Sequence, residues 1–449
     1  MASATLSLSS AGYDLLEYLD APGTDQLSVK KAGNAHQIKS TVKGNTIDAL
    51  GISTDLSLTN SNVNVFASVS DFKADLYNGA DTLNIFGNVS GSEIQLDNSF
   101  QNSGNFNDIL NIQGNLNSVD GGLSSVDNII YAGGGNDTIR IAGSIENSNI
   151  FLGTGNDSII IGGNATNVDI KGDEYESING NDYIEFRGAA TDVRVQSGGG
   201  SDTVIFSKGL NSSVPDLTSD FSNVLSGLAA VELGSGNDSL ILGKGTYENA
   251  TFNTGSGTDT ISIASGSFTN VNFQLDGAWD TSYDGAVDEN LAGGDKSTSA
   301  ANTWFTTTNF SSNNAAGDTL VFGSGNIFTD TNFYLGQGND SLVFGSGSTF
   351  NNWNDIGSTI NTGLGADTIV FGSGTSFFDN TTLNLGNDGV EDIVRFAANS
   401  FTPSAPEIRI IGADDYDVLF VGTDSYHYDT SIDNWLLNGS DTISYKSLT

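Results

Sequence analysis

One turn motif in this sequence carries residue types that bind cations. Gly-x-Gly-x-Asp occurs in full seven times, and NGND is a near match. Glycine permits the positive φ values of a tight turn and lets backbone carbonyls converge. If such turns stack, their carboxylates lie about 5 Å apart, and like charges at that spacing need water, hydrogen-bond donors or a cation. The turns end at Asp137, Asp157, Asp182, Asp202, Asp238, Asp259, Asp340 and Asp367.

Two kinds of chemistry fit this column of carboxylates. Calcium takes six to eight oxygen ligands, which stacked aspartates and turn carbonyls can supply. Bound calcium would also offset negative charge and couple metal binding to folding. Alternatively, each aspartate accepts hydrogen bonds from backbone N–H groups of the turn, with no metal. The sequence leaves both readings open, with calcium as the expected cofactor.

The elements that must position these turns are repeating β-strands. Each aspartate is followed by apolar residues two and four positions later, as in Asp157, Ile159 and Ile161, and copies recur about every 20 to 27 residues. Period-two alternation is typical of a strand with one buried face, and so short a repeat indicates one coil of a stack. A second alternating run, such as Val168 and Ile170, provides another strand per coil. The sequence predicts an all-β fold, a right-handed parallel β-solenoid (a β-helix or β-roll) with two main strands per coil, caps and inserted loops.

The turn sequences GGGND, GTGND, GSGND and GQGND resemble the repeats-in-toxin (RTX) nonapeptide, Gly-Gly-x-Gly-x-Asp-x-U-x with U apolar. The resemblance covers residues 75–445 discontinuously. It implies a parallel β-roll in which the turn aspartates and backbone carbonyls bind calcium between stacked turns. RTX motifs follow one another in tandem and line both sides of the roll, whereas here one complete turn occurs per coil. The opposite turn, such as GGNAT, lacks the aspartate, so at most one calcium column is expected.

Interruptions of the repeat divide the chain. We expect an N-terminal cap with degenerate coils in 1–74, solenoid in 75–206, 232–276 and 317–449, and insertions in 207–231 and 277–316, with a C-terminal cap at the end of the last segment. Caps are expected because a bare solenoid end exposes an unpaired strand edge. The long insertion carries Trp279, Tyr283 and Trp304, which either contact a ligand such as a glycan or pin the loop to the solenoid.

An apolar stripe is predicted on the outer face of the aspartate-led strands. The third residue after the aspartate points outward and is aliphatic in six coils. Such a stripe needs cover, either from an inserted segment or from another subunit. We therefore expect self-association or contact with other structural subunits. The residues are Ile160, Ile205, Ile241, Val321, Val343 and Val370.

Composition excludes several classes of protein. The formal net charge of −39 disfavours nucleic acid and anionic membranes as partners. It either keeps the protein soluble or suits divalent cations. The absence of cysteine removes disulfides and thiol chemistry. The N-terminus lacks the basic and apolar regions of a Sec signal, and no apolar run approaches the roughly 20 residues of a membrane helix, so membrane insertion is not expected.

The expected role is structural. Solenoids also occur in polysaccharide lyases and epimerases, which combine carboxylates with Arg or Lys. This chain has 15 basic residues and two histidines, with no basic cluster beside an acidic pair. We therefore predict no catalytic residues and no enzymatic activity. The sequence favours an extracellular scaffold, surface layer, adhesin or fibre, either on a bacterial cell surface or in a virion such as a phage; the alternative is a polysaccharide-binding or polysaccharide-modifying protein.

Overall fold

The computed structural model is built from β-strands throughout the part of the chain that it describes. Contacts divide the chain into two compact units, one reaching Lys208 and one comprising Gly209–Asn211 and the chain from Ala230 on. The described part contains no helix long and apolar enough to cross a membrane. Described residues are 4–9, 12–13, 27–32, 35–40, 46–48, 50–54, 62–66, 68–70, 72–76, 79–97, 106–117, 128–173, 180–213, 229–275, 296–299, 304–306, 309–312, 317–351, 357–378, 381–397, 408–431, 434–437 and 441–442.

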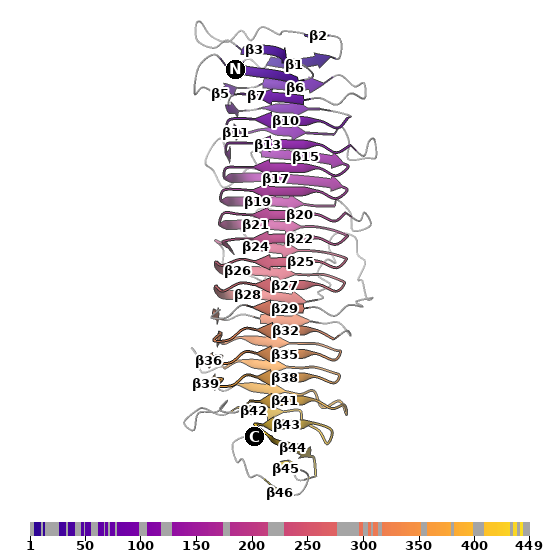
Figure 1. The fold of residues 1–449 in the computed structure, drawn as a ribbon, viewed down its shortest axis with the longest axis vertical. Coiled ribbons are helices and arrows are strands. Elements are labelled where there is room, and N and C mark those ends of the chain that lie inside the picture. The colour runs from indigo at the N-terminus through magenta and orange to yellow at the C-terminus, as the bar shows by residue number, and fades with distance from the viewer. Residues whose placement is uncertain are drawn as a thin grey trace. The chain divides into compact units, whose positions relative to one another are not determined.

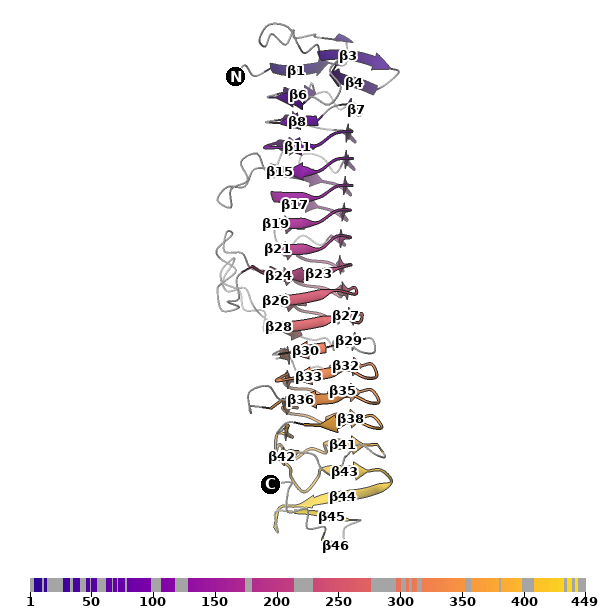
Figure 2. The ribbon, with the colours of Figure 1, turned by 90° about the vertical axis from the view of Figure 1, so that its left-hand side faces the viewer.

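The first unit contains two stacks of strands (Figures 1 and 2). The strands that follow the turn aspartates, with their end strands, form what we call the Asp-led sheet; the others form the second sheet. The Asp-led sheet holds β3 (Leu27–Ala32), β4 (Ala35–Ser40), β7 (Asn62–Val65), β10 (Thr82–Ile85), β13 (Ile109–Ile112), β16 (Thr138–Ile141), β18 (Ser158–Ile161), β20 (Tyr183–Phe186) and β22 (Thr203–Phe206). The second sheet holds β1 (Ala4–Ser9), β2 (Gly12–Tyr13), β5 (Thr46–Asp48), β6 (Leu50–Thr54), β8 (Ser68–Ser70), β9 (Lys73–Asp75), β11 (Val89–Ser90), β12 (Glu93–Gln95), β14 (Leu116–Asn117), β15 (Asn128–Gly134), β17 (Ile145–Thr154), β19 (Ala165–Lys171) and β21 (Ala190–Gln196).

The register of the first unit is that of a parallel solenoid. From β7 to β22, each Asp-led strand pairs in parallel with the strand of the next coil, without slippage. Ile159 pairs with Ile139 on one side and Ile184 on the other, and all three are fully buried. Because side chains alternate along a strand, the residues between them face outward. The predicted parallel β-solenoid and its aliphatic interior are confirmed.

The second unit repeats this arrangement. Its Asp-led sheet holds β25 (Ser239–Leu242), β27 (Thr260–Ile263), β29 (Lys296–Ser299), β32 (Thr319–Phe322), β35 (Ser341–Phe344), β38 (Thr368–Phe371), β41 (Ile393–Phe396), β43 (Val418–Val421), β44 (Asp424–Asp429), β45 (Asn434–Leu437) and β46 (Asp441–Thr442). The second sheet holds β23 (Gly209–Asn211), β24 (Ala229–Glu232), β26 (Thr246–Asn253), β28 (Ser267–Leu275), β30 (Trp304–Thr306), β31 (Asn309–Ser312), β33 (Ile327–Thr329), β34 (Asn332–Tyr334), β36 (Thr349–Asn351), β37 (Thr359–Asn361), β39 (Ser376–Phe377), β40 (Thr382–Asn384) and β42 (Arg409–Ile411). Pairing is parallel from β25 to β43 and antiparallel from β43 to β46, so the stack ends in a meander.

Phenylalanine is frequent in the core of the second unit, where it packs beside aliphatic residues such as Leu342 and Ile369. The rings of Phe322, Phe344 and Phe371 stack with centroids 5.4 and 5.2 Å apart. Phe328 and Phe350 begin a second column whose rings meet the first edge-on, at 5.1 Å between Phe328 and Phe344. Offset stacks and edge-to-face contacts are the favoured aromatic geometries, so the two columns lock successive coils together.

Each coil has a corner that the two-strand expectation omitted. The second sheet often begins with a short strand, such as β11, before the main one, such as β12. In longer strands the two parts join through a residue in the left-handed region, for example Asn167 in β19 with a φ of 52°. Asparagine tolerates this conformation better than branched residues. The corner gives the second sheet a third inward-facing position in each such coil. Fully buried residues such as Val89 and Ala165 occupy it.

The long insertion predicted for 277–316 contains a further coil. β29 pairs in register with β27 and β32, and β30 and β31 pair with β28. Sequence reasoning took this segment for a loop because Ser297 and Ser299 stand at the register positions of Ile261 and Ile263. Trp304 opens β30, whereas Trp279, Tyr283 and residues 214–228 of the other insertion lie outside the described residues.

Candidate metal-binding turns

Two glycines shape the turn that precedes each Asp-led strand. In one coil they are Gly153 and Gly155, with φ values of 97° and 127°. A Cβ built on Gly153 would lie 1.9 Å from the carbonyl oxygen of Gly133, and one on Gly155 would lie 1.8 Å from that of Gly135. Both the backbone conformation and the close approach of the neighbouring turn therefore require glycine. As a result, carbonyl oxygens are packed at close quarters along the stacked turns.

The turn aspartates form a hydrogen-bonded ladder. The backbone N–H of Asp137 donates to Oδ1 of Asp157 at 2.6 Å, and that of Asp157 donates to Oδ1 of Asp182 at 2.9 Å. Each carboxylate thus accepts the N–H of the aspartate one coil earlier. Bonds of 2.6 to 2.9 Å repeat this pattern for the pairs Asp81–Asp108, Asp108–Asp137, Asp182–Asp202, Asp238–Asp259, Asp318–Asp340, Asp340–Asp367, Asp367–Asp392 and Asp392–Asp417.

A second ladder runs beside the first in the opposite direction. The N–H of Asn156 donates to Oδ1 of Asn136 at 2.8 Å, and the N–H of Asn181 donates to Oδ1 of Asn156 at 2.6 Å. Here the side chain accepts from the following coil, whereas the aspartate accepts from the preceding one. Sequence reasoning missed this role, although an asparagine before the turn aspartate is visible in the motif. Asn107, Asn237 and Asn339 accept in the same way.

In six aspartates of the ladder, the second carboxylate oxygen is left without a hydrogen-bond donor. In six aspartates Oδ2 is buried and accepts no hydrogen bond, while the residues are at most 2 % exposed. A buried oxygen in this state costs about 1 to 3 kcal/mol, and more if charged, unless a proton, water or cation satisfies it. In these six residues the predicted turn-capping role therefore accounts for only one oxygen of the carboxylate. The six residues are Asp108, Asp137, Asp157, Asp182, Asp340 and Asp392.

Burial shifts the protonation of this column. Desolvation, with smaller contributions from neighbouring carboxylates, raises the pKa of Asp108 and Asp157 to about 9 and that of Asp182 to about 8. In the second unit the same cause raises the pKa of Asp340 and Asp392 to about 8. Backbone donation to Oδ1 opposes the shift without cancelling it. Near neutral pH these groups therefore hold a proton unless a cation takes its place.

The ladder fits an oxygen-seeking cation better than a transition metal. Within the described ranges, no three His, Cys, Asp or Glu side chains converge to hold a metal ion. A cation between coils would instead draw on one or two carboxylates and on turn carbonyls, which is the kind of ligand set that calcium accepts. The unsatisfied Oδ2 atoms supply the side-chain part of that set.

The structure brings together all eight aspartates predicted as metal ligands, each in the ladder of its own unit. It adds members whose turns lack the complete motif, because the ladder needs only an aspartate ahead of the strand. These are Asp81, Asp108, Asp318, Asp392 and Asp417. It also places Asp97 and Asp173 against the turns, which sequence reasoning missed because no repeat leads to them.

The predicted outer stripe is partly continuous. All six residues lie on the outer face of the Asp-led sheet and are partly exposed. Val321, Val343 and Val370 are direct neighbours in register. Ile160 and Ile205 are separated by Glu185, and Ile241 lies beside Ser262.

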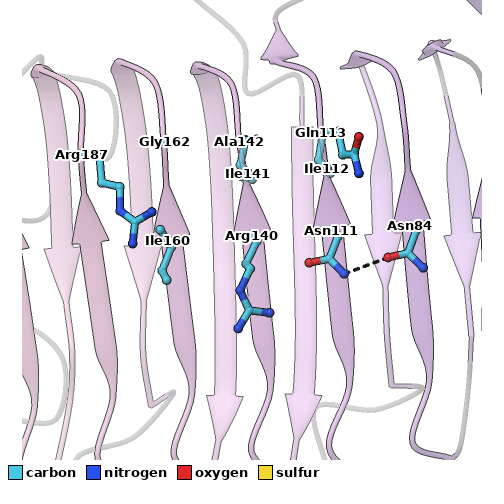
Figure 3. Close-up of a pocket in the computed structure, with 10 residues that line it drawn as sticks. All are labelled: Asn84, Asn111, Ile112, Gln113, Arg140, Ile141, Ala142, Ile160, Gly162 and Arg187. Carbon is cyan, nitrogen blue, oxygen red and sulfur yellow. Dashed lines mark hydrogen bonds between the residues drawn. The ribbon is translucent and has the colours of Figure 1, made fainter.

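A hollow of about 390 Å³ lies on the outer face of the Asp-led sheet in the first unit (Figure 3). It is floored by side chains from successive strands, with Asn84, Asn111, Arg140 and Ile160 side by side. Nδ2 of Asn111 donates to Oδ1 of Asn84 at 2.8 Å. Arg187 also lines the hollow and pairs with Glu185, which follows Ile160 in the same register. Amide, guanidinium and apolar groups therefore share one surface.

The comparisons with known proteins give one structural match. No protein-family model matches the sequence, and no curated protein matches it. One solved structure, a hyperactive, Ca²⁺-dependent, β-helical antifreeze protein from an Antarctic bacterium, aligns with 85 % of this chain and 94 % of its own. The sequence identity is 18 % and the TM-score is 0.41.

Proposed function

We propose that this chain is a non-enzymatic structural or adhesive solenoid that acts outside the cell, on a cell surface or in a virion, and that calcium bound along its turns stabilises it. The observation that carries the proposal is the set of six buried Oδ2 atoms that accept no hydrogen bond, those of Asp108, Asp137, Asp157, Asp182, Asp340 and Asp392. Calcium is abundant outside cells and satisfies such oxygens together with turn carbonyls. The RTX resemblance predicts the same column from sequence.

A structural role is supported by how the acidic groups are arranged. The ladder aspartates with raised pKa values recur in successive coils, inside the turns, and each accepts the backbone N–H of the aspartate one coil earlier. General acid–base catalysis instead needs an acid and a base that reach one substrate. We infer that this repetition serves stacking and cation binding rather than a single reaction. The expected chemistry of the bound metal is to neutralise carboxylates and cross-link coils.

The test is metal removal from the full-length chain. Each site filled at about 100 times its Kd adds about 2.7 kcal/mol to the free energy of unfolding. Several such sites should separate the melting temperatures in calcium and in EDTA by many degrees at pH 7.5. Magnesium serves as the control, since it prefers smaller octahedral sites and retains its waters. An identical melt in all three conditions refutes the calcium proposal.

A second candidate function is glycan binding at the hollow beside Arg140. The observation in its favour is the row of outward amide groups ending at a guanidinium, which is suited to hydroxyl and carboxylate groups of an acidic polysaccharide. Arg140→Ala should weaken retention on acidic glycans without changing the melting temperature. Equal retention of wild type and variant on acidic and neutral glycans rejects this candidate.

A further inference from the structure

Asp173 occupies a turn position that is glycine in the adjacent coils. Phe151, Lys171 and Gln196 are aligned across β17, β19 and β21, so Asp173 falls in register with Gly153 and Gly198 two residues later. A Cβ built on Gly198 would lie 2.8 Å from Cβ of Asp173. An extra carboxylate therefore enters the turn where the repeat otherwise has no side chain.

The Asp173 carboxylate is buried and only half satisfied. The residue is 8 % exposed, Oδ2 accepts the N–H of Gly180 at 2.8 Å, and a weaker backbone contact from Gly199 also reaches the carboxylate. Oδ1 is buried and makes no hydrogen bond of good geometry. Oδ2 of Asp182, in the same coil, is likewise buried and unsatisfied. Two acceptors within one turn thus lack a hydrogen bond of good geometry.

Backbone oxygens complete the surroundings of this turn. A Cβ on Gly172 would lie 2.4 Å from Oδ2 of Asp182 and 2.2 Å from the carbonyl oxygen of Ser197. A Cβ on Gly180 would lie 2.0 Å from the carbonyl oxygen of Gly155 and 3.2 Å from Oδ2 of Asp173. Oxygens from two carboxylates and two carbonyls therefore lie close around these two glycines.

We propose that Asp173 and Asp182, with the carbonyls of Gly155 and Ser197, form a divalent-cation site that binds more tightly than the ordinary turns of the column. The inference rests on the proposed calcium binding by that column. An added carboxylate raises the ligand charge at one turn, and ligand charge is what tunes calcium affinity. A site with two carboxylates is also consistent with the finding that, among the described residues, no three His, Cys, Asp or Glu side chains converge.

Asp97, which follows β12 in the coil before that of β15, also places an extra carboxylate in a turn. A Cβ on Gly133 would lie 2.4 Å from Cβ of Asp97, so Asp97 takes the same first-glycine position. It is 6 % exposed, and its Oδ1 is buried without a hydrogen-bond partner. The N–H of Gly134 donates to Oδ2 at 3.4 Å. The first unit therefore has two turns with an extra carboxylate.

Calcium titration of the full-length chain by calorimetry tests the inference. Wild type should show a tight class of two sites and a weaker class. Asp173→Gly restores the glycine of the adjacent coils. It should move one tight site to the weak class by raising the Kd of that site tenfold or more. Asp97→Gly should do the same, and the double variant should lack the tight class. Glu146→Gln, which removes an exposed charge on β17, is the control.

Three results overturn the inference, and they are distinguishable. If wild type binds calcium in a single class and Asp173→Gly leaves the isotherm unchanged, the tight site is refuted while the column proposal stands. If wild type binds no calcium, both fail. If Glu146→Gln weakens the tight class as much as Asp173→Gly, the effect is one of net charge. Asp173→Asn keeps the side-chain shape and removes the charge, so a loss of affinity there, with unchanged circular dichroism, excludes misfolding as the cause.

Discussion

The backbone N–H of Asp137 donates a 2.6 Å hydrogen bond to the carboxylate of Asp157, one coil later. That bond fixes the carboxylate inside the turn and orients its other oxygen away from any protein donor. The neighbouring asparagine ladder, such as Asn136 to Asn156, ties the same coils from the opposite direction. Together the two ladders tie each turn to the coil before it and the coil after it.

The first prediction is that rising pH widens the difference in stability between the calcium-bound and the metal-free protein. The folded-state pKa values of about 8 to 9 at Asp157 and Asp182 exceed the ordinary value of 3.8. The folded state therefore binds more protons than the unfolded state between about pH 4 and 9, and the free energy of unfolding without metal falls as pH rises through that window. Calcium competes with those protons, so its stabilisation grows over the same range.

Thermal melts from pH 5 to 9 in EDTA and in calcium measure this divergence. The melting temperature in EDTA should fall steadily, and the gap between the two series should be widest at pH 9. Parallel curves would contradict the assignment of the buried carboxylates as the calcium ligands.

The second prediction concerns the turn glycines. Gly155→Ala places a Cβ 1.8 Å from the Gly135 carbonyl at a φ of 127°, so we expect a loss of roughly 3 kcal/mol or more in the free energy of unfolding. Gly347→Ala is the matched control, since its φ is 70° and its Cβ meets nothing within 4 Å. It should cost only about 1 to 2 kcal/mol. Equal costs in urea denaturation would mean that the stacked carbonyl does not constrain the turn.

The sequence was sufficient for the parts of the fold that repeat. Alternation after each aspartate located the Asp-led strands, as at Ile159 and Ile161, because burial of one face imposes a period of two. It failed where no repeat exists: β29 lacks the apolar residues, and Asp173 replaces a glycine only once among the adjacent coils. The sequence also could not predict that one carboxylate oxygen accepts a hydrogen bond while the other does not, since motif spacing does not show which atom lies near a donor.

The third prediction concerns the outer stripe of the second unit. Val321, Val343 and Val370 form a row of outward apolar side chains on neighbouring strands. If a second subunit covers this row, Val343→Lys should weaken self-association by roughly tenfold, equivalent to about 1.4 kcal/mol. Asn361→Lys adds the same charge on the second sheet and should leave assembly unchanged. Sedimentation velocity in calcium gives the readout, and a wild type that stays monomeric, or equal weakening by both variants, rejects the interface.

The fourth prediction separates the two roles of one carboxylate. The amide oxygen of Asp157→Asn can still accept the N–H of Asp137, so the ladder bond should survive, whereas the buried charge is lost. In EDTA at pH 9 the variant should be more stable than wild type by roughly 1 to 3 kcal/mol, because no unsatisfied carboxylate has to be buried. In calcium it should be less stable by about 2 to 3 kcal/mol, because one bound ion loses a charged ligand. Glu146→Gln, an equal change of charge away from the turns, should show neither effect. A variant less stable in both conditions would mean that the carboxylate serves only the ladder, and one more stable in both would mean that no ion is bound there.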